Sequence, residues 1–560
     1  MKTYIPGKDA ALEDSISKIR ILLKKHGFVI EEVSCLNPLP DIWSVHLCDR
    51  DCPLLFSNGK GTSKKAALAS ALGEFVERLS TNFFFSDYYL GEKEKYYPGE
   101  KFFPANSQKF LSEKLWKFYN PDGELKAENL IDINSKNSER GICCIPFSDF
   151  KNNETVFFPV NILNNLYVSN GMAAGNSNSE AQSQALSEII ERYVKNKIIA
   201  EEISLPEVPG EILDKFPEIL IVIDKLEEIG LEILIHDASI GGQFPVINIT
   251  LLNPDNGTCF AAFGAHPQFE VALQRTLTEL FQGRSLDQLN EFRSPSFDSE
   301  TVAEHYNLEN HFIDSDGLIS WKFFNKIPDF EFEYWNYEGT TKQEVDFLTK
   351  IIFNNGFDIF ISELNFMEMY SCRIIVPGMS EIYPVDDLVW NNKNEGIFFR
   401  DDILNLKNLD IDQLKKLSGK IETYGLNDNQ LVCELIGITA DNGSEWEDFR
   451  LSELKGLIAL AVGEFKIALE YLTRTLFFGQ ISKEKNLRFS CLQTILEMKL
   501  SSDFITPDYE NILSKLYSPA VYNLCQKILS GENIFSSLHS EFQNHKKLIE
   551  AHKKIMLTVY

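Results

Sequence analysis

The sequence lacks any long apolar run. A helix that crosses a bilayer needs about 20 consecutive apolar residues, and no window of this chain approaches that length. The N-terminal segment MKTYIPGKDAALEDS also lacks the apolar stretch of a secretory signal peptide. We therefore expect a cytoplasmic protein that makes no membrane contact.

Basic residues are scarce relative to acidic ones. The chain has 54 Lys and Arg against 82 Asp and Glu, which gives a formal net charge of -28. This surplus repels the phosphate backbone of nucleic acids, so we expect no direct nucleic-acid partner. An acidic surface still permits a local basic pocket.

Paired cysteine motifs and a Walker A motif are also missing. The ten Cys do not form two facing CxxC pairs, which excludes a zinc ribbon and a disulfide framework. Residues 59–62 (GKGT) and 7–9 (GKD) lack the spacer of a P-loop, so any nucleotide site is of another kind. No nucleophile has a convincing His partner, since His266 beside a Pro is typical of a turn.

Three similar segments are present instead. Residues 57–80 read SNGKGTSKKAALASALGEFVERLS, and residues 169–193 read SNGMAAGNSNSEAQSQALSEIIERY. A weaker copy, RTLTELFQGR, covers residues 275–284. The pattern predicts a helix in each segment, entered through a turn of Gly and small residues.

Each predicted helix places acidic or amide groups three residues apart, on one face. Clustered carboxylates raise each other's pKa unless cations lie among them, and Mg²⁺ prefers such oxygen ligands. If the helices converge, they predict a magnesium site. The pairs are Glu74 with Glu77, Glu188 with Glu191, and Glu279 with Gln282.

Arginine accompanies each pair. Arg78, Arg192 and Arg275 offer the planar fork that binds phosphate, and the predicted helix starts would add free backbone N–H groups. A purely structural alternative is open, because Glu74 with Arg78 also forms an ordinary i to i+4 surface salt bridge. The recurrence of the pattern favours a functional site.

A unit of helix, Gly and two strands recurs about three times. Its helices, near residues 9–26, 220–229 and 345–355, end at Gly27, Gly230 and Gly356. The third unit has no signature helix, and chance similarity within an α+β chain is the alternative. The predicted strands are 43–48 and 53–56, 232–236 and 246–252 with a hairpin loop at 253–257, and 358–363 and 371–377.

The character changes near residue 400, after which helix follows helix. Residues 454–471 resemble a tetratricopeptide hairpin, on which helices near 487–500, 509–530 and 541–556 are expected to stack. We predict domains at 1–400 and 401–560, with 285–335 as an acidic excursion. The fold class is therefore α+β with an all-α, tetratricopeptide-like C-terminal domain.

Longer motifs carry a family resemblance. They are IPGKDAALEDSI, GKGTSKKAALASALGEFVERLSTN, LYVSNGMAAGN, ERYVKNKIIAEEISLPE, GGQFPVI, NGTCFAAFGAHP and RIIVPGMS. Over nearly its whole length the chain resembles the YcaO family. The resemblance implies ATP and Mg²⁺ as ligands, bound at a non-P-loop site in which several Glu hold the magnesium ions.

The resemblance also assigns residues by position. It makes Glu188, Glu191 and Arg192 the catalytic candidates. The magnesium ligands it implies are Glu74, Glu77, Glu188 and Glu191. The nucleotide and its phosphates would be contacted by Lys8, Ser15, Arg78, Asn176, Glu180, Arg192 and Arg275.

Three functions that differ in class are open, and the resemblance implies the two enzymatic ones. The first is an ATP hydrolase that assists a radical enzyme in β-methylthiolation of a small-subunit ribosomal protein. This chain has no CxxxCxxC for the radical enzyme's cluster, so its role would be accessory, and a homodimer is expected. The alternatives are an amide-activating peptide modifier (cyclodehydratase or thioamide-forming) and a non-catalytic helical scaffold. The products, AMP with pyrophosphate or ADP with phosphate, stay open.

Overall fold

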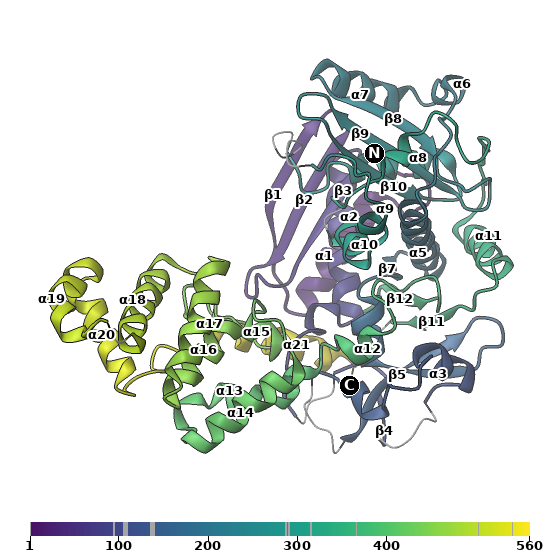
Figure 1. Cartoon of the computed structure of the whole chain (residues 1–560). Helices are drawn as coiled ribbons and strands as arrows, with labels where there is room; N and C mark the ends of the chain where they lie inside the picture. Colours follow the sequence, from purple (N-terminus) through teal and green to yellow (C-terminus); the bar gives the residue numbers. More distant parts are fainter. Residues whose placement is uncertain are drawn as a thin grey trace.

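The structure is a computed structural model that describes residues 2–92, 96–104, 110–134, 140–285, 288, 292–313, 316–365, 367–501, 503–539 and 541–559. Mixed helices and strands form a body up to about residue 390, and most of the helices after residue 400 extend to one side of it (Figure 1). The α+β class predicted from the sequence is confirmed. No helix in these ranges is long and apolar enough to cross a membrane.

Two units of the body follow the chain in order. Each has a first helix, three antiparallel strands and a signature helix. The first unit comprises α1 (Leu12–Lys25), β1 (Ile30–Leu39), β2 (Ile42–Asp49), β3 (Phe56–Gly61) and α2 (Lys64–Ser80). The second comprises α7 (Pro217–Glu228), β8 (Glu232–Asp237), β9 (Val246–Asn253), β10 (Thr258–Ala265) and α8 (Phe269–Glu279).

The third unit is assembled from two distant parts of the chain. Its helix α11 (Thr341–Asn354) and strands β11 (Phe360–Glu363) and β12 (Tyr370–Ile375) come late. Strand β12 pairs with the early strand β7 (Met172–Gly175), which leads into α5 (Asn178–Ala200). The third unit therefore has a signature helix, contrary to the sequence prediction. The prediction missed it because α5 comes before α11, the first helix of this unit, in the chain.

The first helix of each unit ends in the same way. Gly27, Gly230 and Gly356 adopt φ of 81°, 87° and 86°, a left-handed conformation that favours Gly. Each Gly N–H bonds at 3.0 Å to the carbonyl three residues earlier, and the next N–H reaches back five residues. The predicted helix caps are confirmed, and the threefold repeat has a common geometry.

The Gly-rich segments before the signature helices are strands, whereas the sequence pattern predicted turns. A Cβ atom at Gly59 of β3 would lie 2.1 Å from the carbonyl oxygen of Ala67 in α2. At Gly175 and Gly264 a Cβ atom would come within 2.7 and 2.2 Å of atoms of α5 and α8. Glycine is needed because each strand lies directly against the helix that follows it.

Adding a methyl group at this contact is expected to be costly. Gly59→Ala should lower the free energy of unfolding by about 3 kcal/mol, because the added methyl group would meet backbone atoms of α2 that must shift to admit it. The matched control is Gly73→Ala in α2, which has open space and should stabilise by about 1 kcal/mol. Urea unfolding measures both, and equal effects of the two variants would contradict the close approach.

Two other predictions about the ends of elements are wrong. Residues 53–56 form mostly a turn, because Asp49 Oδ2 accepts the N–H of Cys52 at 3.1 Å, and β3 starts only at Phe56. Helix α8 ends at Glu279, so Gln282 lies in the following turn, just before Gly283 with φ of 73°. Glu279 and Gln282 therefore do not share a helix face.

A larger sheet joins the third unit to the rest of the body. It has the order β4-β5-β11-β12-β7, with β6 paired to β5. These strands are β4 (Lys101–Phe103), β5 (Ile142–Asp149) and β6 (Thr155–Pro159). Within the predicted excursion, α9 (Ser299–Ala303) and α10 (His305–Ile313) pack on α5. The domain limits and the excursion stay predictions.

The helices after residue 400 are α13 (Arg400–Leu404), α14 (Ile411–Tyr424), α15 (Val432–Leu435), α16 (Leu451–Ala461), α17 (Phe465–Phe478), α18 (Lys483–Leu500), α19 (Thr506–Tyr517), α20 (Pro519–Leu529) and α21 (Gln543–Val559). The hairpin predicted at 454–471 corresponds to α16 and α17, while its likeness to a tetratricopeptide stays a prediction. The single helix predicted at 509–530 is two helices, because Ser518 adopts φ of 69° before Pro519.

Helix α21 does not stack on that hairpin, as the sequence suggested, but returns to the body. Its residues Leu548, Ala551 and Ile555 belong to the core that also contains Phe28 and Phe75 of the first unit. An apolar stripe at helical spacing predicts a buried face without saying what covers it. The last helix is thereby part of the first core.

Two histidines on α21 also attach it to the body. His545 Nε2 donates to the carbonyl of Tyr89 at 2.8 Å, and its Nδ1 accepts the N–H of Thr439. His552 Nε2 lies 3.4 Å from the carbonyl of Tyr96. Burial lowers the pKa of each imidazole from 6.5 to about 4. Both side chains are therefore neutral in the folded protein at pH 7.

Acid is expected to release α21. Between pH 6.5 and about 4 the unfolded state binds more protons than the folded state. The free energy of unfolding contributed by the two neutral histidines is therefore complete above pH 6.5 and is lost as the pH falls toward 4. Each histidine would contribute up to about 3 kcal/mol. Hydrogen exchange of residues 543–559 at pH 7.5 and 5 measures the loss. A His545→Gln and His552→Gln variant should show a smaller difference, and an equal difference would contradict the assignment.

Candidate functional site

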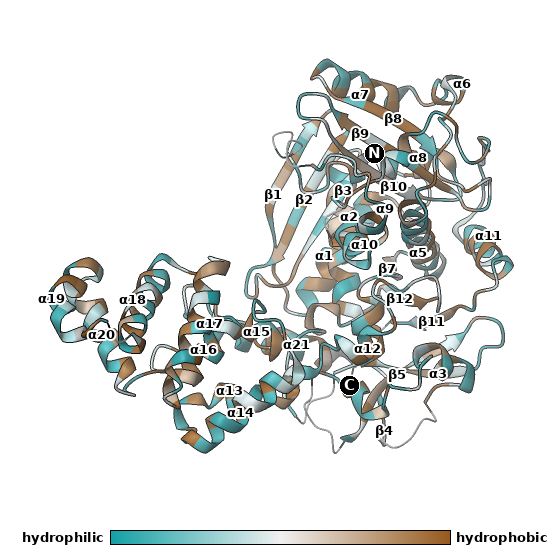
Figure 2. Ribbon diagram, viewed as in Figure 1, coloured by the Kyte–Doolittle hydropathy of each residue, from teal (hydrophilic) through white to brown (hydrophobic). Residues whose placement is uncertain are grey.

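The three signature helices form a closed ring. Helix α2 packs against β7, the strand that precedes α5. Helix α5 packs against β10, which precedes α8, and α8 packs against β3, which precedes α2. Figure 2 colours much of α5 hydrophilic, although 12 of its residues are buried in the body. Polar side chains of three helices are thus brought to the same interior region.

Both Glu-x-x-Glu-Arg motifs lie in this region. Arg78 binds Glu74 at 3.1 Å and Arg192 binds Glu188 at 2.8 Å, so the i to i+4 salt bridges of the structural alternative do form. They are not ordinary surface pairs, because the side chains of Glu74 and Glu188 are only 26% and 22% exposed. The pKa shifts of the neighbouring carboxylates help to distinguish a functional site from a purely structural salt bridge.

The carboxylates of the two helices act on one another. Burial raises the pKa of Glu77 well above its usual value, Glu188 and Glu74 raise it further, and Arg78 opposes them. Burial also raises the pKa of Glu188, where Arg192 opposes and Glu191 adds to the effect. Such mutual repulsion is costly to maintain, and a bound cation would relieve it.

Helix α8 contributes the positively charged side chain of Arg275. Arg275 donates to the carbonyl of Ala265 at 3.2 Å and to Gln184, while the N–H of Ala265 donates to Glu191 at 3.2 Å. Burial lowers the pKa of Arg275, and Glu191 and Glu188 oppose that shift. Gln282 instead binds the carbonyl of Asn58 at 3.3 Å, outside the carboxylate group.

Two lysines of this region were not predicted. Lys60 pairs with Glu279, and burial lowers its pKa to about 8. Lys195 donates to the carbonyl of His311 at 2.7 Å, and burial lowers its pKa to about 7. Sequence spacing held no signal for either, since a lysine in a Gly-rich strand or after an acidic pair is usually solvated.

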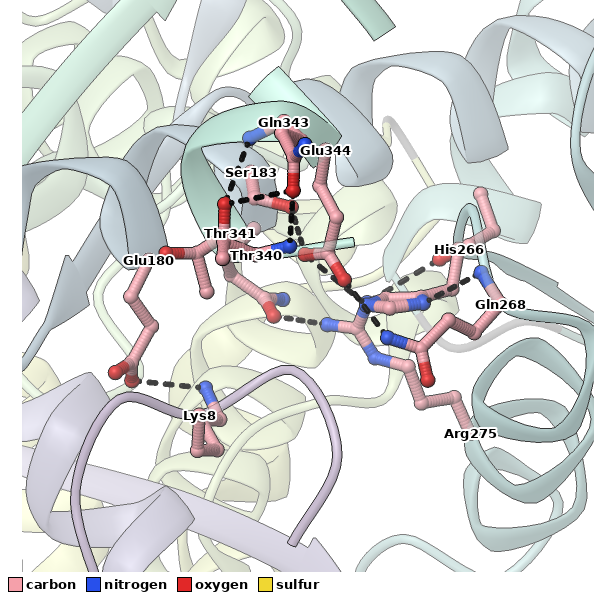
Figure 3. Close-up of polar contacts among 12 residues, drawn as sticks. Lys8, Glu180, Ser183, His266, Gln268, Arg275, Thr340, Thr341, Gln343 and Glu344 are labelled. Atoms are coloured by element: carbon pink, nitrogen blue, oxygen red, sulfur yellow. Dashed lines mark hydrogen bonds and ion pairs between the residues drawn. The ribbon is translucent and has the colours of Figure 1, made fainter. Parts of the chain in front are cut away.

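Four residues implied by the resemblance meet at the start of α5. Lys8 forms an ion pair with Glu180 (Figure 3), with 3.3 Å between Nζ and Oε1, and the N–H of Asp9 donates to the same carboxylate at 2.9 Å. Asn176 donates to Glu180 at 2.9 Å and accepts the hydroxyl proton of Ser15 at 2.9 Å. The structure thereby gathers Lys8, Ser15, Asn176 and Glu180, whose nucleotide role stays a prediction.

A buried carboxylate beside them was missed. Glu344 of α11 is 1% exposed and accepts bonds from Ser183 at 3.0 Å and Gln268 at 2.9 Å, with His266 Nε2 at 3.8 Å (Figure 3). Burial, Arg275 and Lys8 lower the pKa of His266 to about 3, so its ring is neutral at pH 7. From the sequence we predicted His266 to be a turn residue, whereas its side chain belongs to the buried network around Glu344.

Comparison with known proteins gives the family. A model described as "YcaO cyclodehydratase, ATP-ad Mg2+-binding" matches residues 58–380, and "YcaO cyclodehydratase C-terminal domain" matches 396–558. The chain belongs to the YcaO family. The Escherichia coli (strain K12) protein named ribosomal protein S12 methylthiotransferase accessory factor YcaO is 46% identical, over 99% of this chain and 98% of its own. An uncharacterised Haemophilus influenzae protein is equally similar, with the same coverage.

Solved structures of low identity were also matched. YcaO from Methanopyrus kandleri, bound with AMPPCP and Mg²⁺, is 20% identical with a TM-score of 0.40, and the match covers 67% of this chain and 93% of that one. A heterocyclase in complex with substrate and cofactor is 16% identical with a TM-score of 0.46, covering 68% of this chain and 55% of that one.

ATP and Mg²⁺ are the ligands of the YcaO family, and the residues present fit them. Within the described ranges no three His, Cys, Asp or Glu side chains are close enough to hold a metal alone, and arginines bind two of the carboxylates. Mg²⁺ commonly takes only a few protein carboxylates and completes its shell with phosphate and water. In addition, Nη1 of Arg192 is buried without a hydrogen-bond partner among those residues, which suits a phosphate oxygen.

Proposed function

We propose that this YcaO protein hydrolyses ATP with Mg²⁺ and thereby assists methylthiolation of ribosomal protein S12. The observation that carries the proposal is the half-buried pair of Glu-x-x-Glu-Arg motifs on α2 and α5, where burial, together with Glu188 and Glu74, raises the pKa of Glu77 and a bound cation would relieve the repulsion. The name of the Escherichia coli relative supports the ribosomal substrate. The partner would be the radical methylthiotransferase for that protein, and a homodimer stays a prediction.

The proposed roles follow the positions of the side chains. Mg²⁺, when bound, supplies positive charge that neutralises the phosphoryl group during transfer. Arg192 and Arg275 would hold phosphate oxygens, and the Arg192 contact with Glu188 keeps its guanidinium in place. Lys8, Ser15, Asn176 and Glu180 would orient the rest of the nucleotide. The candidate metal ligands are Glu74, Glu77, Glu188 and Glu191.

Two measurements test this proposal. Purified protein with ATP and Mg²⁺, followed by phosphorus NMR, would detect hydrolysis and identify the product pair. Deletion of the gene in its host, followed by mass spectrometry of ribosomal protein S12, should show loss of methylthiolation that the intact gene restores. Unchanged methylthiolation in the deletion strain would rule out the accessory role.

A second candidate is an amide-activating peptide modifier, either cyclodehydratase or thioamide-forming. The family description as a cyclodehydratase favours it. Its signature would be loss of one water, or exchange of oxygen for sulfur, in a peptide substrate. The scaffold alternative requires that Mg–ATP does not bind, which calorimetry would decide.

A further inference from the structure

A contact between residues 332 positions apart holds the N-terminal loop that carries Lys8. Asp9 accepts the hydroxyl proton of Thr341, the first residue of α11, with 2.9 and 3.1 Å from Oγ1 to its two carboxylate oxygens. It also accepts the hydroxyl proton of Ser177, the residue that caps the start of α5. Neither Asp9 nor Thr341 is among the residues that the family resemblance assigns to the nucleotide.

The two neighbours of Lys8 in this loop are fixed on opposite sides of it. The N–H of Asp9 donates to Glu180 at 2.9 Å. Gly7 adopts φ of 72° and lies so close to the ring of His266 that a Cβ atom there would be 3.0 Å from Nε2. A loop that is anchored on each side of a lysine holds its ammonium group in place before a ligand arrives, which lowers the entropy cost of binding.

The start of α11 is itself firmly held. Its first turn carries Thr341 and Glu344 three residues apart, so both side chains project from the same face. Glu344 is buried and accepts hydrogen bonds from Ser183 of α5 and from Gln268, which precedes α8. Figure 3 shows Glu344 reaching toward these two side chains from the helix that also carries Thr341. Thr341 is therefore a fixed point for the loop.

The threefold repeat gives Glu344 a counterpart in the first unit. Ser15 of α1 and Glu344 of α11 stand at the same position relative to the Gly that ends each helix. Ser15 reaches Asn176 just before α5, and Glu344 reaches Gln268 just before α8. In the proposed function the junction at Ser15 faces the nucleotide, whereas the junction at Glu344 is filled by side chains of the protein.

We infer that Thr341 is a positioning residue for nucleotide binding and that, through Asp9, it holds Lys8 where the ammonium meets the nucleotide. The inference rests on the proposed function, which gives Lys8 its nucleotide contact, and adds what keeps that contact in place. Glu180, the partner of Lys8, precedes Glu188 by two helical turns, or about 12 Å along α5. Loss of the Thr341 hydroxyl should therefore weaken nucleotide binding and leave the chemical step nearly unchanged.

Removing this hydroxyl tests the inference. Thr341→Val keeps the shape of the side chain and takes the donor away from Asp9, while Thr341→Ser retains the donor. The matched control is Thr349→Val on the same helix, because the buried hydroxyl of Thr349 has no hydrogen-bond partner among the described residues. Calorimetry measures the binding of Mg–AMPPCP, and release of phosphate or pyrophosphate gives kcat and KM for ATP.

Thr341→Val is expected to bind Mg–AMPPCP about tenfold more weakly, because a hydrogen bond to a carboxylate is lost. The KM for ATP should rise by a similar factor, with kcat within about threefold of wild type. Thr341→Ser and Thr349→Val should both bind within about twofold of wild type. Wild-type affinity in Thr341→Val, or a fall in kcat without a rise in KM, would overturn the positioning role.

A double variant separates this inference from the proposed function. Lys8→Met alone should weaken binding about tenfold or more, and adding Thr341→Val should weaken it no further, because both changes act through one ammonium group. Weaker binding in Lys8→Met with an additional full loss in the double variant would overturn the role of Thr341 and leave that of Lys8 intact. Unchanged binding in Lys8→Met would remove Lys8 from the proposed site, and the inference with it.

Discussion

Replacing Glu188 and Glu191 together by Gln is expected to lower Mg²⁺-dependent ATP turnover by about 10³-fold or more. Gln keeps the size of each side chain and removes both negative charges from one helix. The two remaining carboxylates, Glu74 and Glu77, would hold the cation poorly. Turnover is measured by release of phosphate or pyrophosphate at saturating ATP.

The same variant separates a functional site from a structural salt bridge. The folded protein raises the pKa of Glu188, which means that its charged form is held against burial and against Glu191. Removing both charges should therefore leave the melting temperature unchanged or raise it. Glu201→Gln is the control, since Glu201 pairs with Lys197 on the exposed end of the same helix. Turnover near the wild-type level, combined with lower stability, would support the structural interpretation.

The second large effect is expected far from this site, in the helices after residue 400. Lys485 is 2% exposed and its Nζ binds Glu453 at 3.0 Å, the carbonyl of Glu445 at 2.8 Å, and Asp448. Glu453 is itself 1% exposed, and burial outweighs the ammonium and raises the pKa of Glu453 to about 7. The pair is therefore expensive to bury and depends on each partner.

Lys485→Met should lower the free energy of unfolding by about 3–5 kcal/mol, because it leaves Glu453 buried without its cation. Lys485→Met combined with Glu453→Leu should recover most of that loss, since a buried ion pair is replaceable by apolar groups of similar volume. Urea unfolding of the single and double variants gives the coupling. If the double variant lost as much free energy of unfolding as the two single variants together, the buried ion pair between Lys485 and Glu453 would be contradicted.

Local patterns in the sequence predicted much of this fold. The Gly caps at Gly27, Gly230 and Gly356 were visible because a cap depends on a few adjacent residues. The helices that carry Glu74 and Glu188 were visible for the same reason. The Gly-rich strands were taken for turns, because a strand pressed against a helix and a turn both require glycine.

Contacts between distant residues were not predictable from spacing. Ser15 and Asn176 are 161 positions apart, and Asp9 and Glu180 are 171 apart, so only the resemblance suggested members of this cluster. Glu344 was missed because its neighbours come from other helices and from the loop before α8.

The divided third unit has a consequence for how the chain folds. Helix α5 and β7 leave the ribosome early, but their partner strand β12 ends only at Ile375. Strand pairings between residues far apart in the sequence slow folding. During synthesis α5, which carries Glu188, is therefore made well before β12, the strand that completes its sheet. The core of the first unit is completed later still, because it includes Leu548 and Ile555 of α21. The active arrangement of this enzyme is thus among the last features of the nascent protein to form.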